Sequence, residues 1–187
     1  VKSLDEFAAL FKSTNPVAAA VTTKVSAELR NTASSLSTLV QAAVENHVAG
    51  AYWNADDVWT GFCHRVEAEV DQAHYLAHSV DLTGIGTWLV EHDPSICIIE
   101  VRATVQVSVD VNVEFFVYDT IDHDELNFGS LEVTRNHEME VDVFITLRGD
   151  LEHVAVDELD PSIELAGGEY DVEVGEVDPD FGEESYA

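Results

Sequence analysis

Basic residues are scarce in this chain of 187 residues, where eight lysines and arginines face 37 aspartates and glutamates and give a formal net charge of −29. A surface so rich in carboxylates repels a phosphate backbone, which argues against direct binding of nucleic acid. Three interpretations of the charge remain: hydration in a high-salt cytoplasm, imitation of nucleic acid toward a protein that binds it, and attraction of a basic protein partner. Because net charge acts first on solubility, the first is favoured.

Long apolar runs and paired cysteines are also missing. No run approaches the roughly 20 residues that a membrane-spanning helix needs, and the chain does not open on a basic segment followed by an apolar one, as a signal peptide would. Cys63 and Cys97 are far apart and have no CxxC spacing, so we expect two free thiols in apolar surroundings rather than a disulfide framework. A soluble, cytoplasmic protein without a membrane partner is predicted.

Catalytic motifs are absent as well. The sequence contains no Gly-rich phosphate loop, no GxSxG elbow and no HExxH pair. Cys63 and His64 are neighbours on a predicted helix and therefore do not face each other. His74 and His78 are one helical turn apart, but no third ligand stands at motif spacing. We therefore assign no catalytic residue, expect no enzyme, and predict no cofactor.

The first half of the chain has the signals of helices. Apolar residues recur there at helical spacing, and a Ser/Thr/Asn-rich stretch at residues 31–35 predicts a break between two helices. The predicted starts are Ser3 with Glu6 in a capping box, Asn15 before Pro16, and Asn54 as the cap of a third helix that runs through Val70.

The second half alternates like strands. From Cys97 to Val117 every odd-numbered residue is apolar, and a second run from Leu131 to Leu147 repeats the pattern. Period-two alternation of this length predicts a long, twisted antiparallel hairpin with one face in the core. Shorter strands are expected around 154–156, 163–165 and 170–174. The fold class is α+β, with a mainly helical segment at 1–93, an antiparallel β region at 94–175 and an acidic tail at 176–187.

The connection between the two long strands gathers carboxylates around one histidine, in chemistry that suits a divalent metal ion. An acidic hairpin connection exposed to solvent is the favoured alternative, because the segment lacks the regular ligand spacing of a calcium loop. The candidate metal ligands are Asp119, Asp122, His123 and Asp124.

Two further features stand on the long strands. Arg135 and His137 occupy apolar positions of the second run, where we expect a bulge or strand end rather than paired polar groups inside the core. The outward face gathers carboxylates, whose cross-strand repulsion is tolerable in high salt or under a cationic partner. This candidate interaction face comprises Asp110, Glu114, Glu132, Glu138, Glu140 and Asp142.

Three segments together resemble the region that follows the nuclease domain in a group of larger bacterial and archaeal PIN-domain proteins. They are the opening from Val1 to Phe7, the long alternating strands with a Tyr118-Asp119 end, and the closing stretch from Ile163 to Val174. PIN nucleases cut RNA with acidic residues that bind a divalent metal. The resemblance implies that those residues lie upstream of Val1, and none is mapped onto this sequence.

The leading hypothesis is therefore a non-enzymatic accessory or interaction module that is similar to this PIN-associated region and works with a protein partner, such as a covalently linked nuclease domain. The alternative is a stand-alone inhibitor, a nucleic-acid mimic or immunity-type protein, that binds a basic nucleic-acid enzyme. The third hypothesis is a metal-dependent hydrolase that uses the loop Asp119–Glu125. The oligomeric state and the partner are left open.

Overall fold

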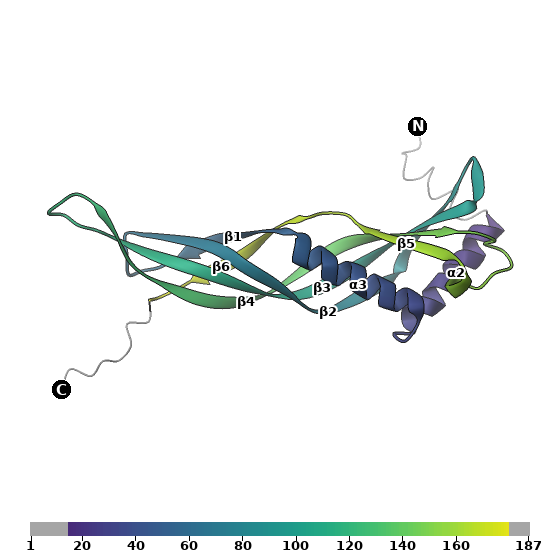
Figure 1. Cartoon of the computed structure of the whole chain (residues 1–187), viewed down its shortest axis with the longest axis horizontal. Coiled ribbons are helices and arrows are strands. Elements are labelled where there is room, and N and C mark those ends of the chain that lie inside the picture. The colour runs from purple at the N-terminus through teal and green to yellow at the C-terminus, as the bar shows by residue number, and fades with distance from the viewer. Residues whose placement is uncertain (1–14, 180–187) are drawn as a thin grey trace. The chain divides into compact units, whose positions relative to one another are not determined.

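The computed structural model describes residues 15–179, in which two helices are followed by six strands (Figure 1). The α+β class is confirmed, with strands in the majority. The predicted capping box at Ser3 and the end of the acidic tail, 180–187, lie outside the described residues. The elements are α2 Pro16–Arg30, α3 Ser35–Gly50, β1 Tyr52–Trp59, β2 Arg65–Val90, β3 Asp93–Tyr118, β4 Glu125–Arg148, the 3-10 turn η1 Val156–Glu158, β5 Asp160–Leu165 and β6 Glu169–Glu176.

The start of α2 is the one that the sequence predicts. The Asn15 side chain caps the helix and accepts a hydrogen bond from the Val17 N–H at 2.9 Å, while Pro16 stands in the first turn, where its missing N–H costs nothing. The predicted break is also confirmed, because α2 ends at Arg30 and α3 begins at Ser35. Every fourth residue of α2 from Val21 onward is buried, as an amphipathic helix requires.

The predicted third helix is wrong: its residues form β1 and the beginning of β2. Val58, Val66 and Val70 are separated by eight and four residues. Such spacing fits a strand of period two as well as a helix. Strand pairing decides between the two, because β1 runs parallel to β6 with Tyr52 opposite Glu169. Within the described residues the segment 1–93 is therefore helical only as far as Gly50. The strand expected at 154–156 is also wrong, since η1 begins there.

The long hairpin is confirmed. β3 and β4 are neighbours in a four-stranded sheet of order β2-β3-β4-β5, in which consecutive strands are joined by connections too short for a parallel crossover. From Cys97 to Phe115 every odd-numbered side chain of β3 is buried. β5 extends the sheet antiparallel to β4, from Val143 opposite Leu165 to Arg148 opposite Asp160. Separately, β1 and β6 form a two-stranded parallel sheet, which the sequence did not predict.

The chain divides into two compact units, each built from three segments. Unit 1 comprises Val1–His47, Ala77–Val105 and Met139–Gly167, and unit 2 comprises Val48–Leu76, Gln106–Glu138 and Gly168–Ala187. In unit 1 the buried faces of both helices supply a core together with the odd positions of β3 up to Val105. In unit 2 the core combines later odd positions of β3 with β6 valines at 172 and 174. Both units draw on sequence from either side of the predicted boundary at residue 93.

No helix among residues 15–179 is long and apolar enough to cross a membrane.

Candidate functional site

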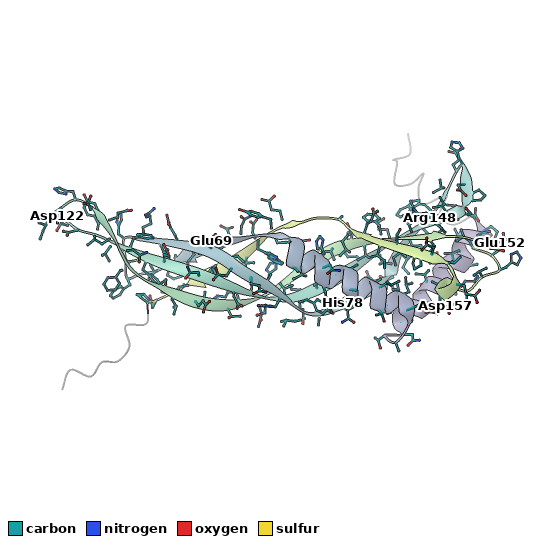
Figure 2. The ribbon with its side chains drawn as sticks, viewed as in Figure 1. Glu69, His78, Asp122, Arg148, Glu152 and Asp157 are labelled. Carbon is teal, nitrogen blue, oxygen red and sulfur yellow. The ribbon has the colours of Figure 1, made fainter. Side chains whose placement is uncertain are left out.

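The loop between β3 and β4 is held by its own hydrogen bonds. The N–H of Asp119 donates to the Asp124 carbonyl at 2.9 Å, and the Asp119 carbonyl accepts from the His123 N–H at 2.9 Å. The carboxylate of Asp119 accepts from the Ile121 N–H at 2.7 Å, which closes the turn. His123 adopts the left-handed conformation with φ of 62°, and Asp122 stands at the far end of the loop (Figure 2).

These contacts bear on the predicted metal ligands. One oxygen of the Asp119 carboxylate accepts the Ile121 N–H, and Nδ1 of His123 lies 3.2 Å from the Tyr118 hydroxyl. Across residues 15–179 no group of three or more histidine, cysteine, aspartate or glutamate side chains is placed to hold a metal ion. Of the four candidates, Asp122, His123 and Asp124 are exposed and Asp119 is half-buried.

An arginine fastens the base of this hairpin in unit 2. The Arg65 guanidinium lies 4.4 Å above the Phe116 ring and forms ion pairs with Glu67 at 2.6 Å and Glu125 at 2.7 Å. Next to it, Nε2 of His64 lies 3.7 Å from the Glu125 carboxylate. The Arg65 guanidinium thus neutralises two carboxylates of unit 2 and covers an aromatic face.

The carboxylates of the candidate interaction face are interleaved with donors. In unit 2, Asp110 accepts from the Thr134 hydroxyl at 2.8 Å and lies 3.1 Å from Nε2 of His74. In unit 1, Nε of Arg102 donates to Asp142 at 3.1 Å, and its Nη1 lies 3.6 Å from Glu140. These donors reduce the cross-strand repulsion that the sequence suggested.

The remaining members of that face have fewer contacts of this kind. Glu138 accepts a long hydrogen bond of 3.4 Å from the Gln106 amide. Glu114 and Asn112 line an open hollow of about 470 Å³ in unit 2, together with Glu67 and Glu69. Glu132 is exposed on β4. Because the six carboxylates are divided between the two units, only those of unit 2 can be considered as one surface.

The histidine and cysteine pairs do not stand on a helix. Cys63 and His64 lie in the connection before β2, and His74 and His78 lie on β2 itself, in different units. Both Nε2 of His74 and the Thr134 hydroxyl point to Asp110, so the hydroxyl does not face a base as it would in a catalytic triad. The Cys63 thiol donates to the Arg65 carbonyl at 3.0 Å, so its partner is a backbone oxygen and not a base.

The expectation of a bulge or strand end at Arg135 and His137 is wrong, because β4 continues through both. Nε of Arg135 donates to the Val174 carbonyl at 2.7 Å, and the rings of His137 and Trp53 are nearly perpendicular, with a centroid distance of 6.1 Å. The indole N–H of Trp53 in turn donates to the Val48 carbonyl at 3.1 Å. Both side chains are half-buried in unit 2, and the Arg135 guanidinium has the acceptor that a partly buried charge requires.

Exposed apolar side chains are concentrated in unit 2. Of the nine large hydrophobic residues that are exposed in the described part of the chain, all except Leu39 belong to this unit. Four of them stand at the end of the β3–β4 hairpin, where Ile121 is 84% exposed. We call this set the hairpin-end cluster: Tyr118, Ile121, Leu126 and Phe128.

The hairpin-end cluster was not predicted, although the sequence contains a signal for it. Leu126 and Phe128 stand beside the acidic connection, in the stretch 125–130 of β4 in which even and odd positions alike are exposed. The regular apolar alternation of the second run begins only at Leu131, so apolar residues between it and the polar connection predict exposed apolar area. Acidic side chains of the connecting loop flank the cluster, so apolar contact area and negative charge occur together at this end of the hairpin.

Comparison with protein-family models, with curated proteins and with solved structures finds no match to this chain.

Proposed function

We propose that this protein is a non-enzymatic interaction module that docks a basic protein partner through the hairpin-end cluster of unit 2. The observation that carries the proposal is the concentration of exposed apolar side chains in this unit, at the end of a hairpin flanked by carboxylates. Large exposed apolar side chains that gather at one end of a hairpin are typical of a binding site, whereas single exposed ones are ordinary. The chemistry of the flanks selects a partner with an apolar centre and a basic rim.

The charge of unit 2 supports a basic partner. Its described residues contain no lysine and two arginines, Arg65 and Arg135. The Arg65 guanidinium forms ion pairs with Glu67 and Glu125, and the Arg135 guanidinium donates a hydrogen bond to the Val174 carbonyl. The remaining exposed carboxylates of this unit attract a cationic partner. This attraction mainly raises the rate of association.

Two biological settings share this mode of binding. In one, the chain is an accessory region that works beside a PIN-type nuclease, and in the other it is a stand-alone inhibitor of a basic nucleic-acid enzyme. In both the protein acts in the cytoplasm and does no chemistry itself. Nothing in the described residues adds support to a metal-dependent hydrolase, because the loop Asp119–Glu125 forms no metal cluster.

The test is a capture experiment with matched variants. The double variant Ile121→Ser and Phe128→Ser removes apolar area from the hairpin-end cluster, and Leu39→Ser removes an exposed apolar side chain from unit 1. We expect one basic protein to be retained from native lysate by the wild type and by Leu39→Ser at low salt, and to be lost with the double variant. Equal retention by all three proteins would refute docking through the hairpin end.

A further inference from the structure

We infer that the partner pairs with unit 2 by adding an extended, basic segment along the open edge of β4, from Leu131 to Glu138. This inference rests on the proposed function and names how the partner binds. β5 is the strand that lies beside β4 in the four-stranded sheet, and it pairs with β4 only from Val143 to Arg148. Among the described residues, the backbone of the stretch from Leu131 to Glu138 therefore pairs with a strand, β3, on one side only, and β6 contacts the stretch through the Arg135 side chain. An unpaired edge of this kind is a template for strand addition.

The direction of the backbone groups on this edge follows from the β5 pairing. The Ala166 N–H donates to the Asp142 carbonyl at 2.9 Å, so the backbone groups of Asp142 point to the β5 side of β4. Exposure alternates without interruption from Leu131 to Leu147, and in such a strand the N–H and C=O of every second residue point the same way. The backbone groups of Glu132, Thr134, Asn136 and Glu138 therefore face the open edge, ready to pair with an added strand.

The other edge of the sheet in unit 2 is less suited to pairing. It belongs to β2, where two neighbouring exposed residues, Asp71 and Gln72, interrupt the alternation. An irregularity of this kind disturbs the ladder and discourages an incoming strand. β4 has no such interruption between Leu131 and Glu138. The regular edge is thus the one on the strand that also carries Leu126 and Phe128.

Side chains along the β4 edge determine the chemistry of the segment. Glu132 and Glu138 are exposed on one face, and Leu131 and Val133 are half-buried on the other. A segment that alternates lysine or arginine with apolar residues matches both faces, because cross-strand pairs of opposite charge stabilise a sheet. The same carboxylates disfavour pairing with a second copy of this chain, since they would lie against like charges.

The proposal is tested with a defined probe on the full chain. The probe is a fluorescent peptide of alternating lysine and valine, and the control peptide alternates glutamate and valine. Asn136→Pro removes one backbone donor that faces the open edge, where proline is tolerated in a strand. Asn136→Ala changes the same side chain and keeps the donor. We expect Asn136→Pro to weaken binding of the basic peptide by about tenfold or more, and Asn136→Ala to leave it within about twofold of the wild type.

Hydrogen exchange supplies a second readout that does not depend on the proline variant. In the wild type, the basic peptide should slow exchange at the amides of Glu132, Thr134, Asn136 and Glu138, while the glutamate peptide should not. Unchanged exchange at these amides, or wild-type affinity in a folded Asn136→Pro protein, would overturn strand addition. Loss of the captured partner with the hairpin-end variant would still stand in that case, so a failure here is distinct from a failure of the proposed function.

Discussion

Two adjacent phenylalanines on β3 allow the register of the long hairpin to be tested directly. Phe115 is 1% exposed and belongs to the buried face of unit 2. Phe116, on the opposite face, packs under the Arg65 guanidinium at 4.4 Å. Replacing a fully buried phenylalanine by alanine costs about 3–5 kcal/mol, because the transfer energy is lost and a cavity remains. Phe116→Ala loses mainly the cation–π contact, about 1 kcal/mol at a half-exposed site.

The two costs differ enough to be separated by thermal unfolding. In a protein of this size 1 kcal/mol shifts the melting temperature by about 2–4 °C, so we expect a fall of roughly 6–20 °C for Phe115→Ala and of about 2–4 °C for Phe116→Ala. Circular dichroism at the strand signal measures both. Equal losses, or a larger loss for Phe116→Ala, would refute the assignment of odd-numbered residues to the core, because a shift of one residue exchanges the two faces.

Three further predictions concern unit 1 and the thiols. Asn15→Ala should lower the free energy of unfolding by about 1 kcal/mol, measured in urea, whereas Asn15→Ser keeps a capping oxygen and should lose little. Burial raises the pKa of the Cys97 thiol to about 11, so iodoacetamide should modify Cys63 in the native protein and both thiols in denaturant, which intact-mass measurement would show. Burial lowers the pKa of His78 below its ordinary 6.5, with Glu45 opposing the shift, so the unfolded chain takes up the proton first as the pH falls. The contribution of His78 to stability is complete above pH 6.5 and is lost below it, and His78→Gln should therefore lose less stability than the wild type between about pH 7.5 and pH 5.5.

How much of this fold was predictable depends on where the decisive contacts lie. Apolar and polar residues alternate between direct neighbours along β3. For that reason the hairpin and its buried face can be predicted from the sequence. Residues 52–59 form a strand because they pair with β6, in which Tyr52 lies opposite Glu169, a residue far away in the sequence. Valines four residues apart cannot reveal such a partner, since their spacing satisfies a helix and a strand alike.

The candidate site shows the same division. Leu126 and Phe128 stand between the acidic connection and the start of the regular alternation at Leu131, and this place in the sequence indicates that they are exposed. The pairing of the half-buried Arg135 was not predictable, because Nε of Arg135 donates to the Val174 carbonyl on a strand of the other sheet. The parity of their positions places the six carboxylates of the candidate interaction face on one side of the sheet, but the two compact units divide them.

The central claim is that a basic partner covers the hairpin end of unit 2. The most direct measurement is hydroxyl-radical footprinting of the captured complex, with peptides read by mass spectrometry. We predict that Ile121 and Phe128 lose their labelling when the partner binds, while Leu39 in unit 1 is labelled as in the free protein. Protection of Leu39 with unchanged labelling at Ile121 and Phe128 would contradict the account, because the partner would then bind to a different surface.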